Sequence, residues 1–172
     1  MKILRIFIFM ILSLQSISNA DDSLNVKFLD LNYILINSLE GKKIIKKIKE
    51  SNNILFEKHS KIQKKLENDK NEILSQQNIL EKDIYNEKVT IHQRNIEKFQ
   101  KDKQSDLNKI NDFKTEETNK LLKNIDRILL EYTKENDINL IFKKESLIVS
   151  NINLDITKII LENLNNDFKN NN

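Results

Sequence analysis

The amino-acid sequence predicts an α+β fold: a small β body of about three to four short strands, a long antiparallel helical hairpin (a coiled-coil tentacle) and a C-terminal helix. From Lys42 to about Asn136 the chain has no proline or glycine, and its only glycine lies just before this stretch. Short apolar runs that are typical of strands lie on both sides of it. The runs can meet in one body only if the helical stretch folds back on itself.

The first twenty residues are expected to be a signal peptide. Lys2 and Arg5 precede an apolar run from Ile6 to Leu14, and a polar stretch then closes on Ala20. This order is typical of a cleaved secretory signal, and the apolar run is short for a membrane span, which needs about 20 apolar residues. We therefore expect residues 1–20 to be removed on export.

The composition limits the possible partners. The formal net charge is +3, and loss of Lys2 and Arg5 with the signal lowers it to +1. Such a balance predicts neither a nucleic acid nor an anionic membrane as a partner. The sequence has no cysteine, so disulfides cannot stabilise the fold, and packing or oligomerisation must do so.

Residues 21–40 are expected to form the N-terminal part of the body. Val26–Leu31 suits a half-buried strand, and Asn32–Ile36 suits a short helix. Ser38 is a good N-cap for the next helix. Gly41 either lies in the opening turn of that helix, where it lets another backbone approach closely, or ends the short helix.

Residues 41–136 are expected to form the arm. Apolar residues spaced by three and four, with polar residues between some of them, predict a coiled-coil seam; its first members are Ile48, Asn52, Leu55, His59, Ile62 and Leu66. A second amphipathic stretch contains Leu107, Ile110, Leu121, Ile125, Ile128 and Tyr132. The seam changes phase after Leu80. A straight helix would be about 140 Å long, so we expect a reversal near residues 84–95 that gives two arms of about 70 Å.

Residues 137–165 are expected to complete the body, and residues 166–172 to form a disordered tail. Ile138–Phe142 and Leu147–Val149 are strand candidates, and Asp155 is a candidate N-cap for the C-terminal helix. Three short strands cannot build a large core, which predicts oligomerisation through the body. The residues expected to form this oligomerisation body are Phe28, Leu140, Ile141, Phe142 and Ile148.

Nothing in the sequence predicts an enzyme. His59 and His92 are the only histidines, and neither has a carboxylate or histidine four residues later that could complete a metal site. There is no glycine-rich phosphate loop, and scattered aromatic residues without tryptophan give no stacking platform for nucleic acid. We assign no catalytic residue, no metal and no cofactor.

Charge is distributed unevenly along the arm. Between Lys42 and Lys65, nine lysines stand against Glu50 and Glu57, and the balance reverses from Leu66 to His92. We call the nine the lysine root: Lys42, Lys43, Lys46, Lys47, Lys49, Lys58, Lys61, Lys64 and Lys65. It is either a solvated helix face or a surface that attracts acidic unfolded polypeptides.

Both ends of the chain resemble a known family. The stretch VKFLDLNYILINSLEGKK resembles the opening of the OmpH/Skp family of periplasmic chaperones, with matching positions at Asp30, Ser38, Gly41 and Lys42. The stretch NDINLIFKKESLIVSNINLDITKIILENLN resembles that family's closing hairpin and helix, whose Asp-Ile-Thr start matches Asp155–Thr157. With the charged helical middle, the resemblance covers essentially the whole mature chain.

The resemblance implies a homotrimer in the periplasm, with a β body and three tentacles around a cavity. It implies ATP-independent holding of unfolded outer-membrane β-barrel proteins, which prevents their aggregation before insertion. Well-known members are strongly basic and this mature chain is near neutral, so we assign no lipopolysaccharide or membrane site and leave membrane association open. The alternative is an exported structural coiled-coil adaptor that binds one specific envelope partner.

Overall fold

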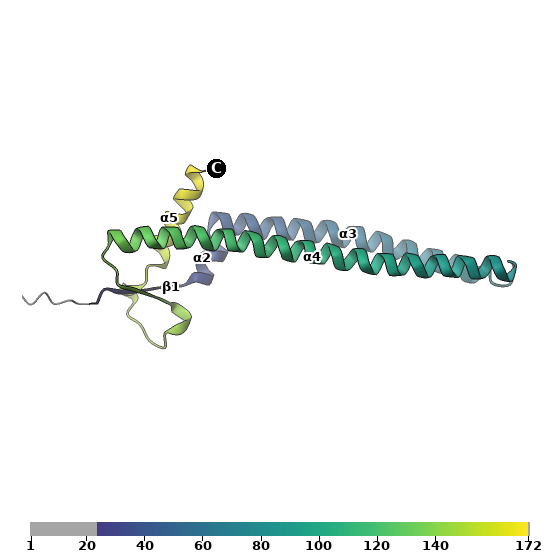
Figure 1. The fold of residues 1–172 in the computed structure, drawn as a ribbon, viewed down its shortest axis with the longest axis horizontal. Helices are drawn as coiled ribbons and strands as arrows, with labels where there is room; N and C mark the ends of the chain where they lie inside the picture. Colours follow the sequence, from purple (N-terminus) through teal and green to yellow (C-terminus); the bar gives the residue numbers. More distant parts are fainter. Residues whose placement is uncertain (1–23, 172) are drawn as a thin grey trace, which may run out of the picture.

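The computed structural model describes residues 24–171. The predicted signal peptide, residues 1–20, and the last residue, Asn172, lie outside the described residues. Two long helices lie side by side and project from a small body (Figure 1). In chain order the elements are β1 (Val26–Leu29), α2 (Leu31–Asn37), α3 (Leu39–Ser75), α4 (Lys82–Glu135), β2 (Leu140–Lys143), the 3-10 turns η1 (Lys144–Ser146) and η2 (Ile152–Leu154), and α5 (Thr157–Asn170).

The junction between α2 and α3 depends on Ser38 and Gly41. Ser38 is fully buried, and its Oγ accepts a hydrogen bond from the Gly41 backbone N–H at 3.0 Å, which confirms the predicted N-cap. A Cβ at position 41 would lie 1.8 Å from the carbonyl oxygen of Leu35. Gly41 therefore lies inside the opening turn of α3, and it is glycine because the backbone of α2 passes too close for a side chain.

The arm reverses at residues 76–81, earlier than the expected reversal near residues 84–95. The amides of Ile79 and Leu80 donate to the Gln76 carbonyl at 3.0 Å, and Lys88 Nζ donates to Gln76 Oε1 at 2.7 Å. The phase change after Leu80 marked the turn itself, because α4 begins at Lys82 and its first half-buried residue is Tyr85.

Polar residues occupy more of the seam than the sequence predicted. On α3, Ser51 takes the seam position that we expected for Asn52, which is exposed. The steps from Ser51 to Leu55 and on to His59 are both four residues, a spacing that follows the straight helix more closely than a strict heptad. On α4, Asp106 lies in the seam and Leu107 is 42% exposed.

The described residues contain two strands, not the three to four expected. β1 and β2 are parallel, in a register that runs from Val26 opposite Leu140 to Leu29 opposite Lys143. The predicted strand Leu147–Val149 is instead part of an exposed loop, in which Ile148 and Val149 are 102% and 88% exposed. No backbone of the described chain pairs with this segment, and an extended segment needs such a neighbour to become a strand.

The C-terminal helix α5 connects the elements of the body. The Ile156 amide donates to the Phe28 carbonyl at 2.9 Å, the Asp30 amide to Thr157 Oγ1 at 2.8 Å, and the Leu39 amide to Asn165 Oδ1 at 2.8 Å. The helix begins two residues after the expected N-cap Asp155, whose carboxylate nevertheless accepts from the Thr157 amide at 2.8 Å.

The expected disordered tail is wrong for residues 166–170, which continue α5. Asp167 accepts a hydrogen bond from Arg127 of α4 at 2.6 Å, and the ammonium of Lys43 lies 5.2 Å from the centre of the Phe168 ring. These contacts tie the last turns of α5 to the arm, which asparagine-rich composition alone does not reveal.

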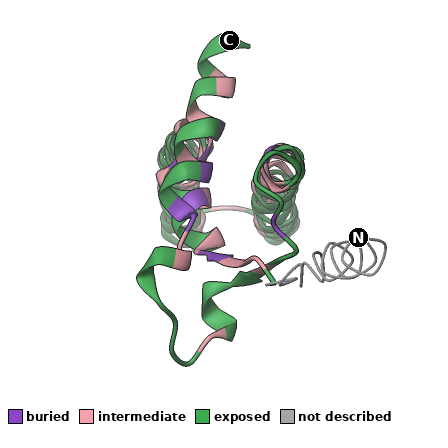
Figure 2. Cartoon of the chain, turned by 90° about the vertical axis from the view of Figure 1, so that its left-hand side faces the viewer, coloured by how far each residue is buried: buried purple, intermediate pink, exposed green. Residues whose placement is uncertain are grey.

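Apolar burial is concentrated in the body and at the adjoining end of the arm (Figure 2). The buried cluster comprises Leu29, Ile34, Ile44, Leu121, Ile125, Ile128, Ile156, Ile160 and Leu164. Between Ile44 and Leu121 no residue of the arm reaches the same burial. The arm is therefore anchored at one end and only partly buried along the rest of its length.

Replacing Gly41 with alanine should destabilise the protein. The new Cβ would clash with the backbone carbonyl of Leu35, which cannot rotate away, and the resulting strain costs about 3 kcal/mol. Alanine is a better helix former than glycine by roughly 1 kcal/mol, which offsets only part of this cost. Urea unfolding followed by circular dichroism should show a net loss of about 2 kcal/mol. Lys42→Ala, at an exposed neighbouring position, is the matched control, and equal stability of the two variants would contradict this role for Gly41.

Candidate functional site

The lysine root lies on the first three-quarters of α3, and all nine lysines are exposed. Two of them contact aromatic rings: Lys43 contacts Phe168 of α5, and the ammonium of Lys47 lies 6.0 Å from the ring centre of Phe113 of α4. Lys46 forms an exposed pair with Glu50 at 3.9 Å. Within residues 24–171, the root lysines that form neither an ion pair nor a contact with an aromatic ring are Lys42, Lys49, Lys61, Lys64 and Lys65.

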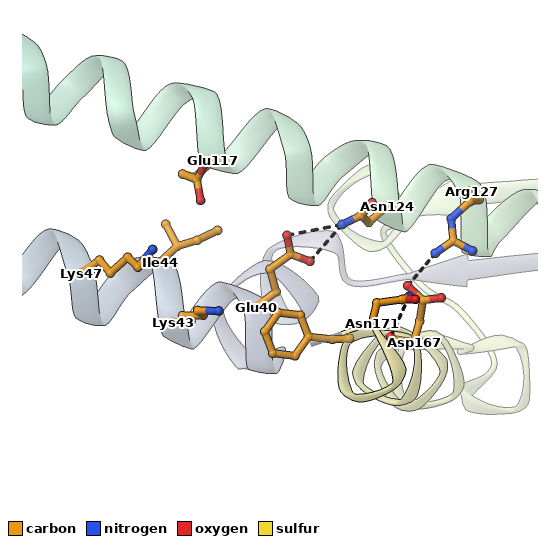
Figure 3. A pocket seen from close by; sticks show the side chains of 10 residues that line it. Glu40, Lys43, Ile44, Lys47, Glu117, Asn124, Arg127, Asp167 and Asn171 are labelled. Carbon is orange, nitrogen blue, oxygen red and sulfur yellow. Dashed lines mark hydrogen bonds and ion pairs between the residues drawn. The ribbon is translucent and has the colours of Figure 1, made fainter.

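A polar pocket of about 350 Å³ lies where α3, α4 and α5 meet (Figure 3). Asn124 Nδ2 donates to both carboxylate oxygens of Glu40 at 3.3 and 3.1 Å, and Arg127 pairs with Asp167. The hydrogen bond from Lys120, with smaller contributions from the charges of Lys120, Lys47 and Lys43, lowers the pKa of Glu117 on its rim. Because its cations and carboxylates largely neutralise one another, the pocket holds the helices together and offers little net charge to a ligand.

A polar cluster that the sequence analysis missed crosses the arm farther from the body. Asp106 Oδ2 of α4 accepts a hydrogen bond from Lys58 Nζ at 2.6 Å and forms a second one with His59 Nε2 at 3.1 Å. The His59 ring packs edge-on against Phe99, with centroids 5.8 Å apart. Asp106 and His59 are 13% and 12% exposed. The signal was the position of His59 in the predicted seam, but its partner is 47 residues away in sequence.

The residues expected to form the oligomerisation body do not share one environment. Leu140, Phe142 and Ile148 are 47%, 43% and 102% exposed, and Ile141 is partly buried against the core. Phe28 is 3% exposed, so within this chain it belongs to the interior. A groove of about 420 Å³ between β2 and α4 adjoins the exposed residues and is lined by Leu130, Leu140 and Ile141.

The other histidine lies near the reversal of the arm. His92 borders a small hollow of about 210 Å³ together with Asp69 and Glu72, and its Nδ1 is buried without a hydrogen-bond partner. No group of three or more histidine, cysteine or carboxylate side chains suited to a metal occurs among residues 24–171. None of the helices described between residues 24 and 171 is both long and apolar enough to cross a bilayer.

The family of the chain follows from a comparison of its sequence with family models. The model described as "Outer membrane protein (OmpH-like)" matches residues 25–164, which include both strands and the whole arm. The chain belongs to the OmpH-like family. A search of curated proteins found no match.

A solved structure shows the same fold as this OmpH-like chain. It is a crystal structure from Caulobacter crescentus CB15 described as a candidate outer membrane chaperone (OmpH-like), with a TM-score of 0.79. The alignment covers 84% of this chain and 85% of the other, at 12% sequence identity. At this identity the likeness shows the fold alone.

Replacing Asp106 with asparagine should weaken the arm in a pH-dependent way. The hydrogen bond from Lys58, followed by that from His59, holds the pKa of Asp106 below the ordinary value of 3.8. A carboxylate whose pKa is lowered by folding stabilises the protein above its unfolded pKa, and this contribution is lost as pH falls through the folded pKa. Thermal melts should therefore show a lower Tm for Asp106→Asn near neutral pH, and the difference should shrink below pH 3.8.

The matched control is Asp112→Asn, an exposed residue of the same helix that makes no ion pair within 4.0 Å in the described chain. Equal melting temperatures for the two variants near neutral pH would show that the cluster does not stabilise the arm.

Proposed function

We propose that the chain is an ATP-independent periplasmic holdase chaperone, which binds unfolded outer-membrane proteins and prevents their aggregation before membrane insertion. The observation that carries the proposal is the arm itself. It projects from the body, and its root combines unpaired lysines with the exposed apolar side chains of Ile45, Ile54 and Phe56, which are 47%, 67% and 75% exposed.

Such a surface suits many weak contacts. Long cationic side chains attract acidic segments, and scattered apolar side chains add small contributions of hydrophobic burial without forming one tight site. Membership of the OmpH-like family supports the proposal, and the signal-like pattern of residues 1–20 supports export. No catalytic residue, cofactor or nucleic acid is part of it.

We further propose that three chains assemble through the body. β2 pairs with β1 on one side only, so its other edge has unpaired backbone groups beside the exposed side chains of Leu140 and Phe142. The nearly fully exposed Ile148 and Val149 lie on the loop that follows. Phe28 would support this surface from inside, through the strand pair.

The test of function is aggregation of unfolded outer-membrane barrel proteins diluted from denaturant, without ATP. A holdase should suppress aggregation of several unrelated barrels at near-stoichiometric amounts. Replacing four unpaired root lysines with glutamine should slow association with an acidic barrel about three- to tenfold at low salt and flatten its salt dependence, as measured by stopped-flow fluorescence. The four are Lys42, Lys49, Lys61 and Lys65.

The control variant makes the same charge change outside the root. It replaces Lys70, Lys82, Lys134 and Lys158 with glutamine. Binding of one folded envelope partner, without suppression of aggregation, would favour the adaptor. Equal on-rates and salt slopes for the two lysine variants would reduce the root to a solvated helix face.

The assembly surface is tested by Leu140→Asp. The monomer should tolerate this change because Leu140 is 47% exposed, whereas an interface would have to bury an unpaired charge. Sedimentation velocity should show loss of the trimer. Ile159→Asp, at a position that is 43% exposed on α5, is the control and should stay trimeric. A trimeric Leu140→Asp would show that the assembly surface lies elsewhere.

A further inference from the structure

A groove of about 540 Å³ lies along the arm where α3 and α4 meet. α3 lines it from Phe56 to Glu67, and Lys103 closes the opposite side from α4. A hollow of this volume can take one or two side chains of a polypeptide, not a folded domain. It is far enough along α3 to be separate from the pocket between α3, α4 and α5.

The groove has a fixed floor. His59 lines it, and the histidine ring is held by its hydrogen bond to Asp106 and by its edge-on contact with Phe99. Lys58 holds Asp106 from the other side at 2.6 Å. Because each of these contacts links α3 to α4 across the seam, they keep the two sides of the groove at a constant separation.

The rim of the groove carries an aromatic ring that is largely open to water. Phe56 is 75% exposed although it adjoins a hollow. Removing an aromatic side chain from water is favourable, so a ring left in water beside an open groove favours an apolar side chain that could cover it.

The charges around the groove determine which type of residue is favoured next to the bound apolar side chain. Lys64 and Lys103 have no ion-pair partner within 4.0 Å in the described chain, and Glu67 is the one carboxylate among the lining residues. The two ammonium groups therefore favour a carboxylate next to the bound apolar side chain and disfavour a cation.

We propose that this groove is a binding subsite for an extended polypeptide segment in which an apolar side chain is followed by an acidic one. The apolar side chain packs on Phe56 above His59, and the carboxylate lies between Lys64 and Lys103. The proposal rests on the proposed holdase function and names the chemistry that one part of the arm prefers in its clients.

The absence of cysteine from the sequence allows a direct test in the full chain. Ser60, an exposed residue that lines the groove, is changed to cysteine. The variant protein is then equilibrated under mild reducing conditions with short cysteine-containing peptides, each of which can form a mixed disulfide with the new cysteine by thiol–disulfide exchange. The probes are Cys-Gly-Phe-Glu, Cys-Gly-Phe-Lys and Cys-Gly-Ser-Glu. Mass spectrometry should show Ser60→Cys labelled about three- to tenfold more by Cys-Gly-Phe-Glu than by the other two.

Matched variants separate the two parts of the preference. Asn71→Cys, at an exposed position on α3 outside the groove, corrects for the chemistry of the peptides and should label all three equally. Adding Phe56→Ala should remove the preference for phenylalanine, and adding Lys64→Gln with Lys103→Gln should remove the preference for glutamate. All three are exposed, so the fold should not change.

Equal labelling by the three peptides at position 60 would overturn the subsite, while suppression of aggregation by the same protein would leave the holdase function standing. Displacement of the peptides by phosphatidylglycerol vesicles, but not by an unfolded barrel protein, would assign the groove to a lipid surface and also overturn the proposal.

Discussion

The parallel pairing of β1 with β2 determines the proportions of the molecule, because parallel strands require the chain to return to the start of the first strand. The arm makes this return, and α4 has 54 residues against 37 in α3, an excess of about 25 Å. The lengths of β1 and α2, which lie between the start of β1 and the start of α3, add up to about 23 Å. The longer helix thus covers the distance that a parallel register demands.

The arm depends on the body for its order. Its seam is half-buried from Ile48 outward and includes charged and amide side chains, so apolar burial along the arm is modest. Fully buried residues such as Ile34, Ile125 and Ile160 come from three helices that meet where the arm begins. Concentrating the core at one end keeps the arm ordered while its surface stays only weakly apolar, which is what the proposed weak binding of unfolded chains would require.

The sequence predicted the features that local chemistry determines. The Ser38 N-cap and the seam through Leu55, Ile62 and Leu66 follow from side-chain type and spacing, and the structure confirms them. For Gly41 the sequence left two alternatives open, and the structure supports the close approach within the opening turn of α3. The prediction of a helical hairpin followed from the need for the two ends to meet.

Features set by contacts distant in sequence were missed or misplaced. Leu147–Val149 has the composition of a strand but no partner in the described chain, and the end of α5 is ordered by Arg127 and Lys43, which the tail composition does not reveal. The cluster around Asp106 and the groove beside it likewise need the register between α3 and α4, which the heptad pattern fixes only to within a turn.

The hydrogen bond between the Leu39 amide and Asn165 has a consequence for the order in which the protein matures. Asn165 follows Leu39 by 126 positions, and synthesis proceeds from the N-terminus. The helices of the arm can form through their own local hydrogen bonds as they emerge. The first turn of α3 then still lacks one acceptor, β1 lacks its neighbour, and Ile34 lacks the apolar surface of Ile160 and Leu164. Closure of the body therefore waits for the segment that is synthesised last.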